Sequence, residues 1–516
     1  MRSNESSRNG SRNGSRRKLL ALACAVAMTA LAGCTAGSDE PGESASGVLA
    51  ANWGGFPESW APGAEMEAGY MRVPYENLVA LDAQGEVQPV LATEWDQTDE
   101  ALTLTLREGV TFHDGTLFDA EAVKVNLESI RDGKTAYAGP LKVIKSVDAV
   151  DARTVRINLS EPAPSLLTQL STRGAPMGSP KAIKAGTIAQ TPVGTGPWAY
   201  DAKSSTKGTR MSFAYYDGYW GGEDSVGFRT IELYAIPEDT AATGALSTGE
   251  ISLTDTEANQ FSRIDRGADL KHLGYPAIRN NPMFFDRGNG GAFEDVRVRQ
   301  AACYALDTEE IAKLEPDFKV RSQHFSEGEQ GHNPGVTGYT HDLDKAKELM
   351  AEAGNPQIEV EMLAAPFNEK QMQVYAQQLA KIGIKVSVQA AAPPQYFSQW
   401  NSGRYALGLG GNDELTPYDW YKAWFAEQAP GNPSKTESAE LKEAAAAAIA
   451  AGASEEADEL WRNVTKIISD EALTCAHVAG EELIAWNTKR VTGVKAPTQL
   501  WETNAIDYKA LRPAGE

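Results

Sequence analysis

The sequence predicts an α/β protein, because strand and helix patterns alternate along the whole chain without an internal repeat. Residues 102–107, "LTLTLR", alternate apolar and polar side chains as a half-buried strand does, and residues 151–159 show the same alternation. Residues 358–389 have the pattern of a strand, a helix and a second strand in succession. Such a unit usually forms a parallel strand pair with a right-handed crossover.

The first 33 residues predict an export signal. A polar stretch ends in Arg16, Arg17 and Lys18, and an apolar run of about 15 residues follows it, shorter than the roughly 20 of a membrane-spanning helix. Residues 31–34, "LAGC", resemble the lipobox of bacterial lipoproteins, in which the signal is cut before a cysteine that carries lipid. We therefore expect lipid on Cys34, which anchors the protein at the outer face of the cell membrane. Both the twin-arginine and the general secretory export routes stay open.

After the lipidated Cys34, the stretch that ends at residue 47 is rich in Gly, Ser, Pro and acidic residues, which predicts a flexible tether. Without the signal, the chain keeps 42 of its 48 basic and 69 of its 70 acidic residues, a formal charge of −27. Binding to nucleic acid requires a basic surface. Nucleic acid is therefore excluded as a partner, and about 470 residues remain, enough for two or three domains.

His113, Asp114 and Asp119 lie close together in "TLREGVTFHDGTLFDAEAV" and raise the question of a metal or acid/base site. Gly115 and Asp114 predict a tight turn between a strand and a helix. In that geometry Asp114 bonds backbone amides, Asp119 caps the helix, and His113 packs or donates a hydrogen bond. We expect these three residues to be structural.

A second helix is predicted at residues 343–354. Ala346, Leu349, Met350 and Ala353 fall on one face of it, and Gly354 is suited to end it in the left-handed conformation.

The cysteines and histidines give no clear catalytic or metal-binding pattern. Cys303 and Cys475 are far apart in the sequence, and we favour buried free thiols over a disulfide between them, although an exported protein could form one. His324, His332 and His341 lie in a Gly-rich stretch, where we expect surface histidines rather than a metal site. The sequence contains no H-E-x-x-H, G-x-x-x-x-G-K-[ST] or G-x-S-x-G motif. We expect no enzymatic activity, no cofactor and no metal.

Several segments, in order along the chain, resemble one family. "LATEWDQTDEALTLTLREGVTFHDGTLFDAEAV" is similar to the signature segment of the family 5 extracellular solute-binding proteins of ABC transporters, the oligopeptide, dipeptide and nickel group. "YENLVALDAQGEVQPVLATEWD", "TPVGTGPWAYD", "DGYWGG", "FEDVRVRQAACYALDTEEIA" and "LDKAKELMAEAG" resemble other parts of the family. The resemblance extends from about residue 49 to residue 512.

The resemblance implies a two-lobed periplasmic-binding-protein-like fold with a hinge, an enclosed ligand and an extra small α/β domain in the first lobe. By the family's order, we expect the first lobe at residues 48–62, 194–282 and 487–516, the extra domain at 63–193 and the second lobe at 283–486. It also implies a monomer that binds a peptide or another small solute and delivers it to the membrane permease of an ABC importer.

The ligand site is expected between the lobes. Residues 408–425, "GLGGNDELTPYDWYKAWF", resemble the second-lobe loop in which peptide binders carry an acidic residue for the ligand's amino terminus. We favour Asp413 for this role over Asp419. Tyr418 and Trp420 are expected to face the cleft, where aromatic faces can cover apolar or cationic groups.

In the same stretch, Tyr421 and Trp424 are expected in the helix core. From the first lobe, Asn52 and Trp53 are expected at the cleft.

Other ligands stay open. The family includes proteins that bind oligosaccharides, opines and nickel chelates, and the aromatic residues would suit a sugar ring. The histidine that would follow "PYD" in the nickel binders is absent, so we favour a peptide over a nickel chelate as the ligand. An exported hydrolase would require a pair of carboxylates flanking a substrate bond, and the sequence spacing indicates no such pair.

Overall fold

The computed structural model describes residues 47–64, 69–82, 85–133, 138–172, 175–288, 291–314, 318–410, 414, 416–452, 454–496 and 506–515. The expected signal, Cys34 and nearly all of the tether therefore lie outside the described residues, as does Asp413. No helix among the described residues is both long and apolar enough to cross a membrane.

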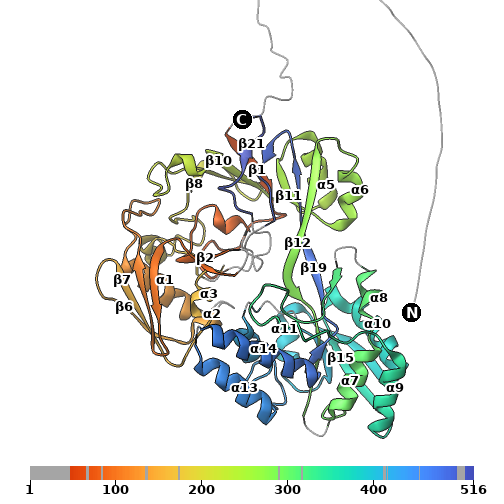
Figure 1. Cartoon of the computed structure of the whole chain (residues 1–516). Coiled ribbons are helices and arrows are strands. Elements are labelled where there is room, and N and C mark those ends of the chain that lie inside the picture. The colour runs from red at the N-terminus through yellow and green to blue at the C-terminus, as the bar shows by residue number, and fades with distance from the viewer. Residues whose placement is uncertain are drawn as a thin grey trace, which may run out of the picture. The chain divides into compact units, whose positions relative to one another are not determined.

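The first lobe is built on a large mixed sheet in the upper part of Figure 1. Its strand order is β12-β19-β11-β1-β10-β9-β8, and β14 pairs with β19. These strands are β1 (Val48–Asn52), β8 (Trp198–Thr206), β9 (Arg210–Tyr215), β10 (Thr230–Tyr234), β11 (Leu253–Asp255), β12 (Leu270–Asn280), β14 (Phe318–Val320) and β19 (Val478–Asn487). The short elements with it are η2 (Glu223–Ser225), α5 (Asp239–Thr248), η3 (Ala258–Gln260), α6 (Phe261–Ile264), β20 (Val491–Thr492) and β21 (Arg512–Pro513).

The extra domain has its own antiparallel sheet, in the order β4-β5-β7-β6, and its own hydrophobic core. Its elements, with the segment that leads into it, are η1 (Gly69–Arg72), β2 (Val79–Leu81), β3 (Val87–Pro89), β4 (Ala92–Gln97), β5 (Ala101–Leu106), α1 (Ala120–Arg131), α2 (Ala138–Leu141), β6 (Ile144–Ala149), β7 (Thr154–Leu159), α3 (Leu166–Gln169) and α4 (Pro180–Ala185).

The cluster of His113, Asp114 and Asp119 is structural, as predicted. An oxygen of Asp119 accepts a hydrogen bond of 2.9 Å from the Ala122 amide and so caps α1, and Asp114 accepts one of 3.1 Å from the Thr116 amide. The His113 ring lies 2.9 Å from the Gly196 carbonyl and accepts from the Gly194 amide at 3.3 Å. His113 therefore joins the extra domain to the first lobe.

The glycines of "VGTG" permit a close approach between backbones. The Gly196 amide donates to the Pro74 carbonyl at 3.0 Å, and a Cβ on Gly194 would lie 1.9 Å from the same carbonyl oxygen. Any side chain at Gly194 would therefore separate the two segments that join the extra domain to the first lobe.

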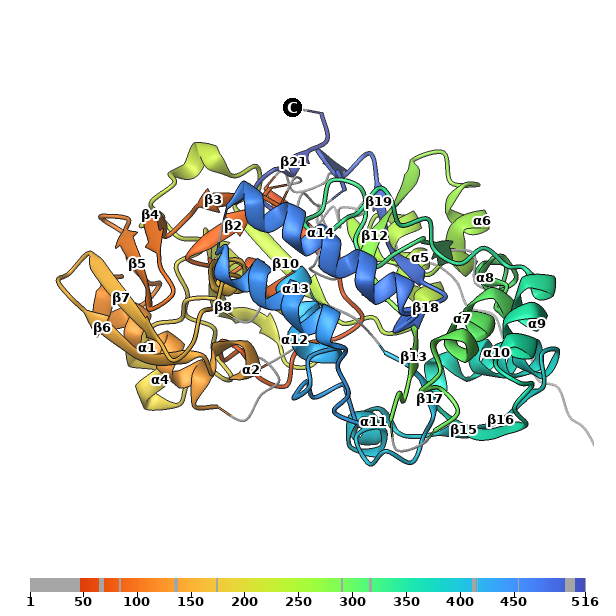
Figure 2. The same ribbon diagram turned by 60° about the horizontal axis from the view of Figure 1, so that its bottom comes forward.

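The second lobe contains a sheet in the order β16-β15-β17-β13-β18. As predicted, β15 and β16 are parallel and connected by α10, and Gly354 follows α9 with φ +85°. The strands are β13 (Met283–Phe285), β15 (Ile358–Ala364), β16 (Ile384–Ala390), β17 (Leu407–Leu409) and β18 (Thr474–Cys475). The helices are α7 (Val296–Ala305), α8 (Thr308–Ala312), α9 (Leu343–Glu352), η4 (Pro366–Asn368), α10 (Glu369–Ala380), α11 (Pro393–Trp400), α12 (Pro417–Trp424), α13 (Ala439–Ala450) and α14 (Glu455–Asp470). Figure 2 shows α13 and α14 side by side.

The chain passes from the large sheet to the second-lobe sheet at residues 281–282 and returns at residues 476–477. The antiparallel pair β12 and β19 leads to both crossings (Figure 1). Because β19 pairs with β11 and β12, we assign Val478–Asn487 to the first lobe. This assignment moves most of that strand out of the second lobe, where we had expected it from the family's order.

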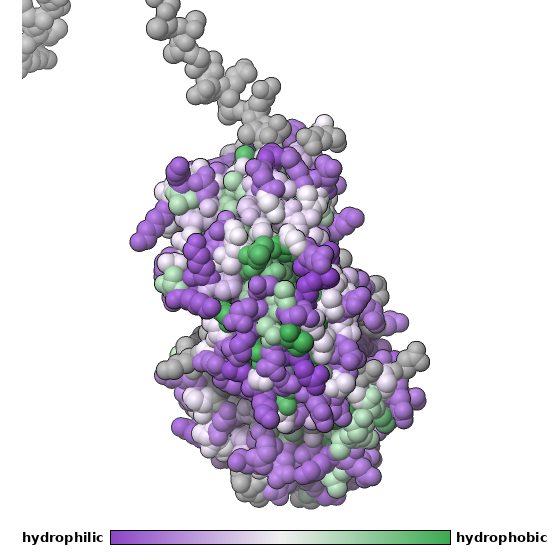
Figure 3. Space-filling view, turned by 90° about the vertical axis from the view of Figure 1, so that its left-hand side faces the viewer, coloured by the Kyte–Doolittle hydropathy of each residue, from purple (hydrophilic) through white to green (hydrophobic). Residues whose placement is uncertain are grey.

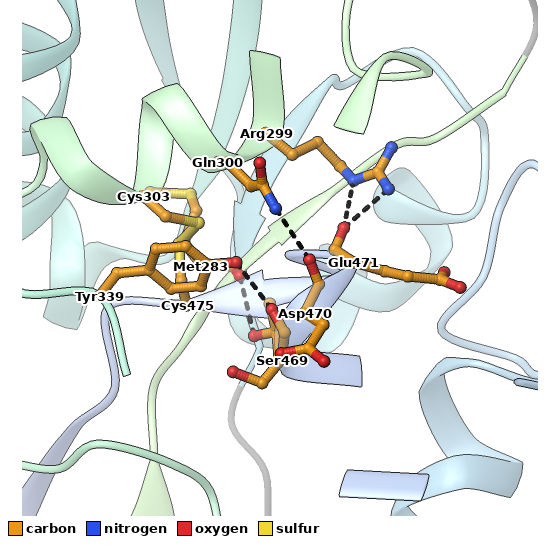
Figure 4. Close-up of a disulfide and its surroundings, with 10 residues drawn as sticks. Met283, Arg299, Gln300, Cys303, Tyr339, Ser469, Asp470, Glu471 and Cys475 are labelled. Atoms are coloured by element: carbon orange, nitrogen blue, oxygen red, sulfur yellow. Dashed lines mark hydrogen bonds between the residues drawn. A yellow bond between two sulfur atoms is a disulfide. The ribbon is translucent and has the colours of Figure 1, made fainter. Parts of the chain in front are cut away.

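The expectation of free thiols at Cys303 and Cys475 was wrong, because the two residues form a disulfide with their Cα atoms 5.8 Å apart. It ties α7 to β18, one residue before the return crossing (Figure 4). The same region is held by Gln300, whose amide donates to the Asp470 carbonyl at 3.0 Å, and by Tyr339, whose hydroxyl donates to the Ser469 carbonyl at 2.7 Å. The sequence could not reveal the pair, because 172 positions separate the cysteines.

The expectation that His324 is a surface residue was also wrong. His324 is buried, and its ring stacks on Trp420 with centroids 4.6 Å apart. His341 is exposed and His332 is half-buried. The Gly-rich segment therefore contributes a core residue, because it folds back onto α12.

The face of the molecule on the side of the extra domain is mostly hydrophilic, with hydrophobic residues gathered near the middle of the view (Figure 3). Leu117 and Val150, both in the extra domain, keep 65% and 60% of their surface exposed. Single exposed apolar residues such as Leu117 and Val150 are normal on the surface of a folded domain in water.

We predict that replacing both Cys303 and Cys475 by serine lowers the free energy of unfolding by up to about 5 kcal/mol, because the disulfide closes a loop of 172 positions and constrains the unfolded chain. Denaturant unfolding of the variant and the oxidised protein measures the difference. Alkylation of both cysteines in denatured, unreduced protein would contradict the disulfide.

Candidate functional site

The carboxyl ends of three parallel strands of the first lobe lie at one edge of the large sheet. β1 is parallel to both β10 and β11, so Asn52, Tyr234 and Asp255 end their strands on the same side. In open α/β sheets, ligands bind outside the carboxyl ends of the strands. This edge is therefore the first lobe's side of the candidate site.

Asn52 holds the strand ends together. Its side-chain amide donates to the Ile236 carbonyl at 3.2 Å and to the Thr254 hydroxyl at 3.1 Å, and its oxygen accepts from the Ile236 amide at 2.7 Å. The side chain is buried. We expected Asn52 to reach the ligand, and in this structure it uses its hydrogen bonds to align the three strands.

Trp53 lies next to a cavity of about 120 Å³. Its ring nitrogen donates to the Tyr508 hydroxyl at 2.6 Å, and Tyr508 forms part of the cavity wall. Arg72 and Lys509 also line this cavity, together with Ser171 of the extra domain. The cavity thus lies where the first lobe, the extra domain and the C-terminal segment meet.

The cavity wall carries charges of both signs. Burial lowers the pKa of Arg72 to about 10, against the effect of nearby Asp507, so this guanidinium stays charged at neutral pH. Glu76 is buried in the wall and accepts from the Tyr219 hydroxyl at 2.9 Å and the Trp220 ring nitrogen at 2.8 Å. Lys509 lies 3.8 Å from Glu76. The wall therefore carries two cations and two anions, with each cation close to an anion.

The second lobe contacts the extra domain through α12, at what we call the interlobe seam: residues 161–169 on the extra domain and residues 416–422 on the second lobe. The Tyr418 hydroxyl donates to the Pro162 carbonyl at 3.2 Å, and Lys422 lies 3.6 Å from Glu161. Asp419 accepts hydrogen bonds from Ser165 and Gln169. Ser171 of the cavity wall is two residues beyond Gln169, so the seam and the cavity adjoin along the chain.

Asp419 is buried at the seam. Burial raises the pKa of its carboxyl group, and hydrogen bonds from Ser165, Thr416 and Gln169 oppose this rise. Asp419 is the third residue of α12, and Thr416 caps that helix by accepting from the Asp419 amide at 3.1 Å. The same motif that starts the helix therefore presents this carboxylate to the extra domain.

The aromatic residues around Asp419 divide between the seam and the core. Tyr418 reaches the extra domain, as described above. Trp420 is 2% exposed and packs between His324 and Phe425, whereas we expected it to line the cleft. Tyr421 and Trp424 are buried in the same core cluster, as predicted. The reason for the difference is the 324–325 segment, which covers the face of α12 that carries Trp420.

Sequence reasoning missed Arg72, Tyr508, Lys509, Ser165 and Gln169. No local motif marks any of them, since each is a common residue type outside the quoted segments that suggested binding. Their proximity follows only from the tertiary structure. Asp413, our preferred ligand partner, lies outside the described residues.

The described residues contain no group of three or more His, Cys, Asp or Glu side chains that could hold a metal ion. The seam and the sheet edge instead belong to two α/β lobes connected by paired strands. This architecture defines a two-lobed binding protein of the periplasmic type.

A family model described as "Bacterial extracellular solute-binding proteins, family 5 Middle" matches residues 86–432. The chain therefore belongs to family 5 of the bacterial extracellular solute-binding proteins, as its segments predicted. These proteins are extracytoplasmic substrate-binding components of ABC transporters and bind small solutes; they are not a family of enzymes.

Among curated proteins, the chain is similar to the glutathione-binding protein GsiB of two bacteria. It is 30% identical to that of Pectobacterium atrosepticum over 338 residues, which are 61% of this chain and 63% of that protein. It is 27% identical to that of Salmonella paratyphi A over 442 residues, which are 81% of this chain and 85% of that protein.

Among solved structures, the chain is similar to HbpA2 from Haemophilus parasuis, with a TM-score of 0.79 and 20% identity over 90% of this chain and 99% of that one. It is also similar to DppA from Helicobacter pylori in complex with the peptide STSA, with a TM-score of 0.70 and 22% identity over 90% and 98% of the two chains. Both likenesses confirm the predicted fold class.

We predict that the protein loses stability as the pH falls below about 6.5, because three buried histidines remain neutral in the fold. Burial lowers the pKa of His113 to about 4 and those of His324 and His477 to about 3. The unfolded chain then binds more protons, and each histidine lowers the free energy of unfolding by up to about 1.4 kcal/mol per pH unit.

Urea unfolding between pH 7 and pH 5 measures this slope. His324→Phe should reduce the slope by up to about 1.4 kcal/mol per pH unit, and His341→Asn, which changes an exposed histidine, is the matched control. An unaltered slope in His324→Phe would show that His324 is not buried as a neutral ring.

Proposed function

We propose that the protein captures short peptides between its two lobes and delivers them to the permease of an ABC importer. The observation that carries this proposal is the interlobe seam, where α12 of the second lobe contacts the extra domain. A cavity lined by the first lobe and the extra domain follows the seam along the chain, and its wall contains Arg72 and Lys509 as cations and Glu76 and Asp507 as anions. A peptide is zwitterionic, so its ends match such a wall. Similarity to proteins named for binding glutathione, which is a tripeptide, supports the same ligand class.

Asp413 is proposed to bind the ligand's amino terminus. In the sequence it follows β17 and precedes α12, three residues before the seam. A peptide backbone paired as an added strand, with its charged ends bound by ion pairs, leaves side chains in roomy, hydrated pockets. This arrangement gives broad specificity, and Tyr418 and Trp53 would border the pockets.

We also propose that Cys34 carries lipid, so that residues 35–47 tether the folded lobes to the outer face of the cell membrane. Thirteen residues of this composition span about 20 Å root-mean-square, by the relation for flexible chains. The tether would let the protein, acting as a monomer, approach its permease while it remains at the membrane.

The first test is a titration with peptides of two to six residues, followed by calorimetry and thermal unfolding. We expect at least one peptide to raise the unfolding temperature, because a ligand that binds only the folded state stabilises it. Stabilisation by an oligosaccharide, an opine or a nickel chelate, with none by any peptide, would reject the peptide proposal. Hydrolysis of the added peptides would instead favour an exported hydrolase.

The second test concerns the anchor. Labelling of producing cells with radioactive palmitate is expected to mark the wild-type protein and leave Cys34→Ala unlabelled, because the lipid is attached to that thiol. Label on the Cys34→Ala protein would reject the assignment. Cys303→Ser is the matched control and should keep the label.

A further inference from the structure

Asp419 of the second lobe accepts two hydrogen bonds from the extra domain. One carboxylate oxygen accepts from the Ser165 hydroxyl at 2.7 Å. The other accepts from the Gln169 amide at 2.9 Å and from the Thr416 hydroxyl at 2.8 Å. In the described part of the chain, no ion pair includes Asp419, so the carboxylate depends on these neutral donors.

The donors on the extra domain are directed at the second lobe. Ser165 precedes α3, where a serine commonly caps its own helix, but its hydroxyl makes no such bond and donates to Asp419 instead. Gln169 is the last residue of α3. Both hydrogen bonds therefore join segments about 250 positions apart in the sequence.

We propose that Asp419 is a closure residue: through Ser165 and Gln169 it stabilises the contact between the lobes and so raises the affinity for every ligand, without touching any of them. Separation of the lobes would remove both donors from Asp419. A contact present only in the binding-competent arrangement shifts the equilibrium toward it, and the apparent Kd changes with the population of that arrangement.

The proposal gives Asp413 and Asp419 different roles. Substitution of a residue that binds the ligand's amino terminus lowers the affinity for ligands that carry an ammonium group and leaves the affinity for other ligands unchanged. Substitution of a closure residue lowers the affinity for all ligands by one common factor, because every ligand requires the same closing step. The inference rests on capture between the lobes, and it does not depend on the ligand being a peptide.

The test uses the full-length protein and its double variant Ser165→Ala/Gln169→Ala. This variant removes both donors from the extra domain and leaves the residues of the second lobe unchanged. Thr168→Ala is the matched control, because Thr168 lies in the same helix and its side chain makes no described bond to the second lobe. Asp419→Asn is the conservative variant that keeps an acceptor, and Asp413→Ala is the comparison for ligand contact.

Affinity is measured for free peptides, amino-terminally acetylated peptides, an oligosaccharide and a nickel–histidine chelate. For every ligand that binds the wild type, we expect the double variant to have about tenfold lower affinity and faster dissociation. The factor should be the same for all of these ligands. Asp419→Asn should recover most of the affinity and Thr168→Ala should match the wild type. Unchanged affinity in the double variant, or losses that differ between ligands, would overturn the proposal.

Small-angle X-ray scattering of the ligand-free proteins provides a second measurement. We expect the double variant to have a radius of gyration at least as large as that of the wild type and Asp419→Asn to match the wild type. A more compact double variant would overturn the proposal. Failure of all peptides to bind would reject the proposed ligand class. If the double variant still lowered the affinity for the remaining ligands by one common factor, that result would support closure by Asp419.

Discussion

The rest of the structure depends on two neighbouring passages of the chain, at residues 281–282 and 476–477. β12 and β19 pair with each other in the large sheet; β12 leads into β13 of the second-lobe sheet, and β18 of that sheet leads back into β19. The disulfide fixes Cys475 to α7, and the next residue, Ala476, has the left-handed φ of +56° that is uncommon outside glycine. We infer that motion between the lobes is absorbed here, because hinges are a few residues at the ends of elements.

This constraint explains why the site is assembled from distant parts of the chain. The first lobe supplies the carboxyl ends of parallel strands, the extra domain supplies Ser165 and Gln169, and the second lobe supplies α12. His113 and the glycines at 194 and 196 attach the extra domain to the first lobe, so the domain that contacts α12 is fixed to the first lobe. A ligand that contacts both surfaces at once stabilises the closed arrangement, because separation of the lobes would break some of its contacts.

Much of the fold was predictable because its signals are local. A capping aspartate at Asp119, alternation in β5 and the β15-α10-β16 unit each depend on a few consecutive residues. The disulfide, the burial of His324 and the position of Trp420 depend instead on segments that meet only in the folded chain. The same holds for the site: the segment around Asp419 was recognisable, but its partners Ser165 and Gln169 carry no sequence signal that links them to it.

We therefore propose that the protein is a solute-binding component whose lobes enclose a zwitterionic ligand. Local motifs build the lobes, and long-range contacts join them. Native mass spectrometry of the protein as purified, followed by mass analysis of the released small molecule, tests this most directly. The account predicts one short peptide for each protein molecule. A sugar, an opine or a metal chelate in its place would contradict it.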